Sequence, residues 1–150
     1  MSPAGHTHGK IAARLLLLIG NFVEAGKLGI IYGAETGFVF PDGKTVRAPD
    51  VMFLSAQRIP ADLPEDGFLP VAPDLAVEVA SPADTFQDVT GKADSYLRVG
   101  VKLVWVVDCN ARRVFVFRLG QPVCGFTIGD HLDGGEVIPG LDIALSAIFQ

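Results

Sequence analysis

The sequence is poor in cysteine, in net positive charge and in long apolar runs, and each scarcity excludes a class of protein. Cys109 and Cys124 are too few for a disulfide framework and lack metal-binding spacing, so a reducing cytoplasm is the default compartment. The formal net charge of -5 and the pI near 5.0 argue against a broadly basic surface for nucleic acid. The sequence also has no P-loop-type glycine loop and no Cys/His zinc pattern.

The apolar run Leu15–Ile19 is too short to span a bilayer. Lys10 and Arg14 precede this run, and a signal peptide also has basic residues before its apolar core. Apolar residues around this run recur at helical spacing, and polar residues fall mainly on the other side. The apolar positions are Ile11, Leu15, Leu18, Ile19, Phe22 and Val23. The pattern therefore favours a packed amphipathic helix over a signal peptide, and we expect no membrane partner.

The chain has 150 residues with 49% hydrophobic and 19% charged content, which is typical of one globular domain with a proper core. The Pro41–Lys44 segment is a strong turn signal, and 60–73 is rich in Pro, Asp and Gly. Helices are expected at about 9–26 and 88–99 and in a short C-terminal segment, and strands at 29–40, 46–55, 75–80, 103–108, 114–118 and 125–129. This order predicts a single α/β domain with a curved mixed sheet, a long N-terminal helix and a shorter helix after the third strand.

Two acidic residues, Asp74 and Glu78, interrupt the apolar run 72–80. A buried carboxylate needs a partner, because an isolated charge in apolar surroundings is costly. If strands 46–55 and 75–80 are neighbours, Asp50 and Glu78 can approach each other. Two close carboxylates repel, so the pair invites a divalent cation with a preference for oxygen ligands, Mg²⁺ or Mn²⁺.

Lys92 and Tyr96 lie at i,i+4 spacing on the expected helix 88–99 and so share one face. A lysine near a bound metal could stabilise developing negative charge or orient a water molecule. Asp50, Glu78 and Lys92 together therefore fit metal-dependent phosphodiester hydrolysis. Spacing alone leaves a second interpretation equally open, in which Asp50 caps a turn and Glu78 forms a structural ion pair with Lys92.

Two further residues could lie near such a site. His8 could approach from the start of the first helix, although a mobile terminal histidine is the interpretation we favour. Glu35 falls on the expected strand 29–40, where it either adds a carboxylate or faces outward.

Several ordered blocks, spread over nearly the whole chain, resemble the Uma-two family of restriction-endonuclease-like proteins. They are Val46–Val51, Ala72–Pro82, Lys92–Tyr96, Val99–Asp108, Gly129–Asp130, Leu132–Gly135 and Ile138–Gly140. That family is assigned to the PD-(D/E)XK nuclease superfamily. The resemblance therefore implies a restriction-endonuclease-like α/β core and metal-dependent cleavage of phosphodiester bonds.

The resemblance also implies roles for individual residues. Asp50 matches the motif aspartate and Glu78 the acidic residue of the (D/E)XK half, so both are expected to bind Mg²⁺ or Mn²⁺ and to be catalytic. The lysine position two residues after Glu78 is Ala80 here, and Lys92 is the matching catalytic lysine, supplied from the helix. Asp74 matches a recurrent aspartate, but on a strand it lies roughly 13 Å from Glu78. It is therefore expected to support the metal ligands or to lie in a turn rather than to bind the metal directly. Tyr96, Glu35 and His8 are further candidates for a supporting position beside the ligands.

Family members usually begin with an additional segment resembling a strand pair with an acidic residue. This chain starts almost at the following helix, with His8 near the matching histidine, so one domain over 1–150 without that segment is expected. DNA is the expected substrate, with RNA or a small phosphoester as alternatives, and the resemblance and apolar composition indicate a homodimer. The rival interpretation from another class is a catalytically inactive binding or assembly module that keeps the nuclease fold.

Overall fold

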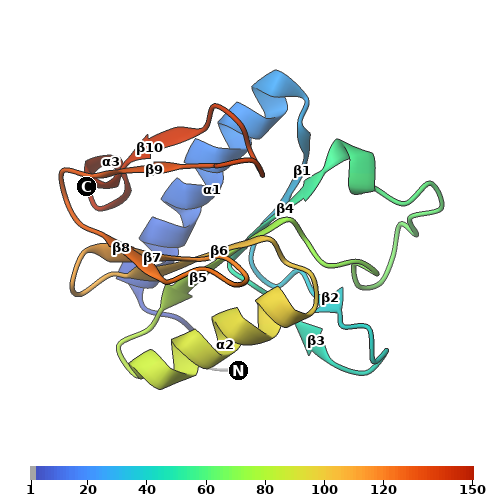
Figure 1. The fold of residues 1–150 in the computed structure, drawn as a ribbon, viewed down its shortest axis with the longest axis horizontal. Coiled ribbons are helices and arrows are strands. Elements are labelled where there is room, and N and C mark those ends of the chain that lie inside the picture. Colours follow the sequence, from blue (N-terminus) through green and yellow to red (C-terminus); the bar gives the residue numbers. More distant parts are fainter. Residues whose placement is uncertain (1–2) are drawn as a thin grey trace.

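A computed structural model describes residues 3–150, and its main feature is one six-stranded mixed sheet with helices on both faces (Figure 1). The helices are α1 (His6–Gly26), α2 (Phe86–Arg98) and α3 (Leu145–Ile148), with a 3₁₀ turn at Ala56–Arg58. The strands are β1 (Gly29–Tyr32), β2 (Phe38–Val39), β3 (Val46–Arg47), β4 (Val51–Ser55), β5 (Leu75–Ala80), β6 (Leu103–Asp108), β7 (Arg113–Phe117), β8 (Cys124–Phe126), β9 (His131–Asp133) and β10 (Asp142–Ala144).

The large sheet has the order β1-β4-β5-β6-β7-β8, and β2–β3 and β9–β10 form two small hairpins beside it. Only β5 and β6 are parallel within the large sheet, so the chain must cross over between them, and α2 is that crossover. The remaining pairs of the large sheet are antiparallel. The expected mixed sheet is confirmed, and β4, which Asp50 immediately precedes, is the direct neighbour of β5, which carries Glu78.

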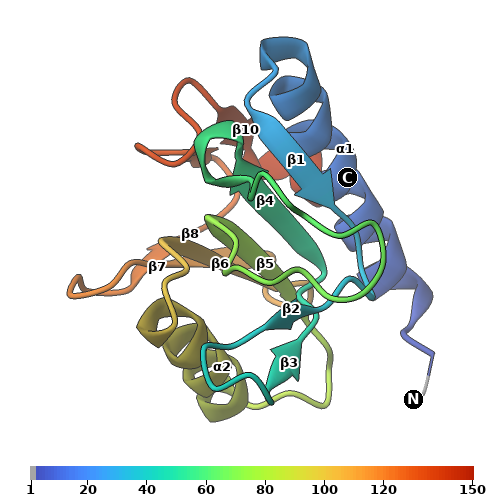
Figure 2. The same cartoon turned by 90° about the vertical axis from the view of Figure 1, so that its right-hand side faces the viewer.

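Each face of the sheet has its own apolar core. Alternate side chains of a strand point to opposite faces, so Leu75, Val77 and Val79 pack under α1 while Ala76 faces α2. Both views show α1 and α2 on opposite sides of the sheet (Figures 1 and 2). Glu78 shares the parity of Ala76 and therefore points toward α2, into a core that is otherwise apolar.

Local sequence explains where α1 ends and where α2 begins. The expected apolar stripe of α1 is buried through Ile11, Leu15, Ile19 and Val23, and the helix ends as Lys27 adopts a left-handed conformation. In α2, Thr85 accepts a hydrogen bond from the Asp88 amide while the Asp88 carboxylate accepts one from the Thr85 amide, a reciprocal capping box. The helix therefore starts two residues earlier than expected.

Two expected strands are each interrupted. The 29–40 stretch divides into β1 and β2 around a turn in which Glu35 has φ 68°. The 46–55 stretch divides into β3 and β4 at Pro49, which lacks the amide hydrogen that a ladder requires. The expected Pro41–Lys44 turn joins β2 to β3, where Asp42 accepts hydrogen bonds from the Lys44 and Thr45 amides. Among residues 3–150, no helix combines the length and the hydropathy needed to cross a bilayer.

Candidate active site at the end of β4 and β5

Asp50 and Glu78 come together at the end of the β4–β5 pair. The ladder ends with the pair Val51 and Val77, and Asp50 and Glu78 are the next residues beyond this pair, close enough for the Asp50 charge to raise the pKa of Glu78. The Asp50 amide donates to the Val77 carbonyl (3.0 Å), and Asp50 Oδ2 accepts from the Val79 amide (2.7 Å). Where the ladder ends, the Asp50 carboxylate therefore accepts a hydrogen bond in place of a backbone carbonyl. The two hydrogen bonds hold Asp50 beside Glu78.

Glu78 is 9% exposed and lies between the sheet and α2. The Tyr96 hydroxyl donates to Glu78 Oε1 at 2.5 Å, and Lys92 Nζ lies 3.7 Å from Oε2. The Lys92 ammonium is close enough for an ion pair but too far for a strong hydrogen bond. The i,i+4 spacing of Lys92 and Tyr96 thus directs both side chains to one carboxylate, each to a different oxygen.

Burial has the largest effect on the pKa of Glu78. It raises the pKa of this carboxyl to about 7, against the opposing effects of the Tyr96 hydrogen bond and the Lys92 charge, and the Asp50 charge raises it further. Burial also raises the pKa of the Tyr96 hydroxyl, as does the neighbouring Glu78 charge. Tyr96 therefore stays a neutral donor, while Glu78 changes its charge near neutral pH.

His8 reaches the same place from the first turn of α1. Its Nε2 lies 3.5 Å from Asp50 Oδ2, and its side chain is 19% exposed. The expectation that a mobile terminus carries His8 is wrong, because the helix includes this residue and holds it against Asp50.

The donor set fits a hard divalent cation. Asp50 and Glu78 supply carboxylate oxygens from adjacent strands, and Mg²⁺ is commonly held by one or two carboxylates together with water molecules. Residues 3–150 contain no cluster of three or more His, Cys, Asp or Glu side chains arranged for a metal. A cation here would consequently depend on these two residues and on solvent or substrate oxygens for the rest of its coordination.

Asp74 lies at the opposite end of β5 and belongs to a separate structural cluster. Its Oδ1 is 3.0 Å from Arg58 Nη1 and 3.3 Å from Lys102 Nζ, and its Oδ2 accepts from the Ser55 amide at 2.8 Å. Burial raises the pKa of Asp74, but the Ser55 hydrogen bond and the Arg58 and Lys102 charges outweigh it and leave the pKa lowered. Asp74 therefore ties β4, β5 and β6 together at the end of the sheet away from Glu78.

Glu35 does not lie on a strand, contrary to expectation, but in the exposed turn between β1 and β2. No hydrogen bond or ion pair within residues 3–150 connects it to Glu78 or Asp50. The positive φ at Glu35 is a feature of the turn, which a strand pattern based on apolar spacing does not reveal.

Two contacts that shape the site were not predictable from the sequence. The ring of Phe38, on β2, lies 5.7 Å from the Tyr96 ring, and the Val79 amide binds Asp50. Both contacts join segments that are far apart in the chain, and neither involves a local spacing that could have indicated it.

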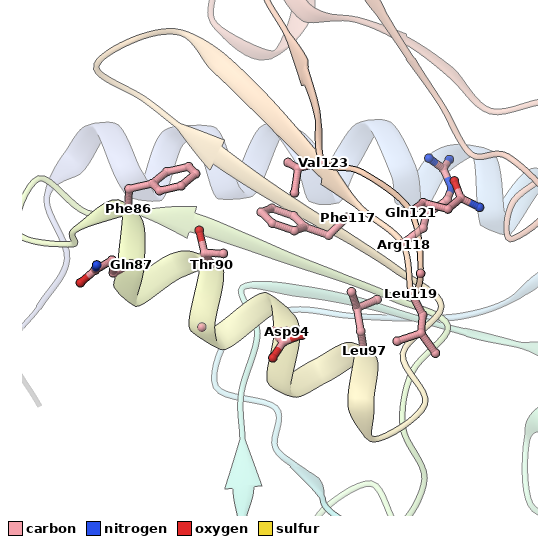
Figure 3. Close-up of a pocket in the computed structure, with 12 residues that line it drawn as sticks. Phe86, Gln87, Thr90, Asp94, Leu97, Phe117, Arg118, Leu119, Gln121 and Val123 are labelled. Carbon is pink, nitrogen blue, oxygen red and sulfur yellow. The ribbon is translucent and has the colours of Figure 1, made fainter.

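A hollow of about 440 Å³ lies away from this site, between α2 and the β7–β8 connection (Figure 3). Its walls are largely apolar, with Phe86, Leu119 and Val123 exposed there. Asp94 is the single acidic residue in the described lining, so this hollow lacks a pair of carboxylates such as Asp50 and Glu78.

A six-stranded mixed sheet with α1 and α2 on opposite faces makes this a protein of the mixed α/β class. The chain belongs to the Uma2 family, described as "Putative restriction endonuclease", whose model matches residues 1–146. A solved structure from Anabaena variabilis, titled a putative nuclease belonging to DUF820, is similar in fold. It has a TM-score of 0.85 and 23% sequence identity, over 99% of this chain and 83% of that chain. No curated protein matches the chain.

Proposed function

We propose that this protein is a metal-dependent endonuclease that hydrolyses phosphodiester bonds of DNA at Asp50, Glu78 and Lys92. The observation that carries the proposal is the convergence of Glu78 on β5 with Asp50, just before the neighbouring β4, and with Lys92, which faces Glu78. Membership of a family described as restriction endonucleases agrees with it.

Each residue has a distinct part in this proposal. Asp50 and Glu78 would hold Mg²⁺ or Mn²⁺, which when bound supplies Lewis-acid stabilisation of charge on the phosphate. Lys92, 3.7 Å from Glu78 Oε2, can neutralise developing negative charge or orient the attacking water. His8 restrains Asp50 from the α1 side.

An acidic chain needs local cations to hold a polyanion, since phosphate contacts dominate the affinity for nucleic acid. Arg58 pairs with Asp74 and Arg98 pairs with Asp94, so both are engaged elsewhere. Arg47 is exposed and forms no ion pair within residues 3–150, and its charge acts on Tyr96. We propose that Arg47 and Lys92 supply the phosphate contacts nearest to the reacting bond.

The first test is isothermal titration of Mn²⁺ into the wild type, Glu78→Ala and Asp74→Asn. We expect binding by the wild type, its loss in Glu78→Ala and its retention in Asp74→Asn, because Asp74 lies at the far end of β5. Cleavage of linear, nicked and single-stranded DNA with Mg²⁺ then tests the activity and the substrate. Wild-type protein that takes up no Mn²⁺ would contradict the catalytic proposal.

The competing proposal is a nuclease-fold binding or assembly module without activity. The ion pair between Lys92 and Glu78 agrees with this proposal, because Lys92 compensates the charge of the buried carboxylate without a metal. The same titration separates the two functions. Light scattering of the purified protein in solution tests the accompanying proposal that the protein is a homodimer.

A further inference from the structure

The two oxygens of Glu78 have unequal surroundings. Oε1 receives a hydrogen bond of 2.5 Å from the Tyr96 hydroxyl, whereas the nearest cation to Oε2, Lys92 Nζ, is 3.7 Å away. The first oxygen is therefore engaged in a short bond, and the second is held only loosely. A carboxylate in this arrangement offers one particular oxygen to a further ligand.

Tyr96 is itself held in place. Its side chain is 1% exposed, and α2 fixes its backbone one helical turn after Lys92. A buried hydroxyl without a partner would be costly, so its bond to Glu78 persists as long as the ring stays where it is. Two buried polar groups consequently determine each other's orientation.

A contact from outside α2 and the large sheet completes this arrangement. Phe38, on β2, is fully buried, and its ring lies 5.7 Å from the Tyr96 ring and 5.4 Å from the Phe40 ring. Both views show the β2–β3 hairpin beside α2 (Figures 1 and 2). The hairpin therefore packs against the side of Tyr96 and restricts rotation of its ring.

We propose that Tyr96 is a positioning residue that occupies Glu78 Oε1 and presents Oε2 to the divalent cation, with Phe38 bracing its ring. This inference rests on the proposed metal-dependent function. It goes further by assigning the two Glu78 oxygens to different partners and by giving the β2–β3 hairpin a part in the site.

The test is Mn²⁺ titration of Tyr96→Phe beside the wild type and Tyr32→Phe. Tyr32 is the other of the two tyrosines and lies on β1, so its substitution is a matched loss of a hydroxyl away from Glu78. Tyr96→Phe keeps the ring against Phe38, and near-ultraviolet circular dichroism checks that the fold is retained. We expect Mn²⁺ affinity to fall about tenfold in Tyr96→Phe and to stay within about twofold in Tyr32→Phe.

A spectroscopic measurement separates positioning from general structural support. If Mn²⁺ binds Glu78, the environment of the Tyr96 hydroxyl changes, and a tyrosine difference absorption should appear on metal addition. We expect this signal in the wild type and in Tyr32→Phe, and its loss in Tyr96→Phe at saturating Mn²⁺. A signal that persists in Tyr96→Phe would overturn the inference.

A further variant, Phe38→Leu, leaves every polar group of the site in place and removes only the aromatic brace. Its Mn²⁺ affinity should lie between those of the wild type and Tyr96→Phe, and wild-type affinity would refute the bracing role. Equal binding by the wild type and Tyr96→Phe overturns the positioning role while the proposed function stands. Absence of Mn²⁺ binding in the wild type itself overturns both.

Discussion

His8 Nε2 lies 3.5 Å from Asp50 Oδ2, so the first turn of α1 meets the residue that precedes β4. This contact restrains an aspartate that the metal site would need. We expect His8→Ala to lower Mn²⁺ affinity about tenfold, because a contact that orients a metal ligand typically contributes that much. His6→Ala, two residues earlier on the same helix, is the control and should leave the calorimetric affinity unchanged. An unaltered affinity in His8→Ala would show that the contact has no part in metal binding.

The raised pKa of Glu78 predicts a stability that falls as the pH rises. Burial moves this pKa from 4.5 to about 7, so the native state binds more protons than the unfolded chain between these values. The stabilising contribution is complete below about pH 4.5 and is lost by about pH 7. Glu78→Gln removes the ionisation, so urea denaturation at pH 8 should show a free energy of unfolding up to about 3 kcal/mol above that of the wild type. At pH 4 the two proteins should be nearly equal.

Lys92 is predicted to act in catalysis rather than in cation binding. Lys92→Met keeps much of the aliphatic packing and removes the charge, so kcat on DNA should fall by about two orders of magnitude. Mn²⁺ affinity should persist, since Asp50 and Glu78 remain. Lys10→Met, a change of the same type on the exposed side of α1, should leave kcat unchanged. Loss of Mn²⁺ binding together with activity in Lys92→Met would instead indicate a structural ion pair.

Arg47 is predicted to contact substrate phosphate. Arg47→Ala should weaken DNA binding and reduce the slope of log affinity against log salt by about 1, the change expected for one lost phosphate contact. The control is Arg98→Ala, because Arg98 is also exposed but pairs with Asp94 at 2.9 Å. Fluorescence anisotropy with catalytically inactive Glu78→Ala as the background avoids cleavage during the titration. Equal salt slopes in the two arginine variants would contradict the assignment.

Asp74 is predicted to stabilise the fold without affecting chemistry. Asp74→Ala leaves Arg58, Lys102 and the Ser55 amide without their shared carboxylate, so the free energy of unfolding at pH 7 should fall by about 3 kcal/mol. Since the folded pKa of Asp74 is lowered, its contribution is present above the unfolded pKa and is lost as the pH falls through the folded value. The difference in the free energy of unfolding between Asp74→Ala and the wild type should therefore become smaller as the pH falls. Mn²⁺ affinity should stay within about twofold.

The strands before and after the α2 crossover were predictable from the sequence because strands buried on both faces must consist mainly of apolar residues. Apart from Glu78 and the terminal Asp108, the segments 75–80 and 103–108 are apolar and rich in valine, as is typical of strands covered on both faces, and the observed bounds agree. The side-chain parity of a strand also shows that Asp50 and Glu78 can meet if their strands are neighbours, and β4 pairs with β5.

Other features depend on tertiary contacts that no local pattern encodes. The hairpin of β9 and β10 has only three residues in each strand, too few for a period to be recognised, and it was not expected. Strand spacing separates Asp74 from Glu78, but the partners of Asp74, which are Arg58, Lys102 and the Ser55 amide, come from other segments and could not be predicted. The helical spacing places Tyr96 beside Lys92, whereas its bond to Glu78 depends on how α2 lies across the sheet.

Lys92 and Tyr96 reach Glu78 because α2 is the crossover between β5 and β6, and this has a consequence for how the sequence can change. Each residue of an α-helix turns by about 100°, so one residue inserted between the Thr85 cap and Lys92 would rotate both side chains away from the carboxylate. A substitution affects one contact, but an insertion there would remove two at once and leave a buried acid with neither donor. This helix should therefore tolerate changes of residue far better than changes of length.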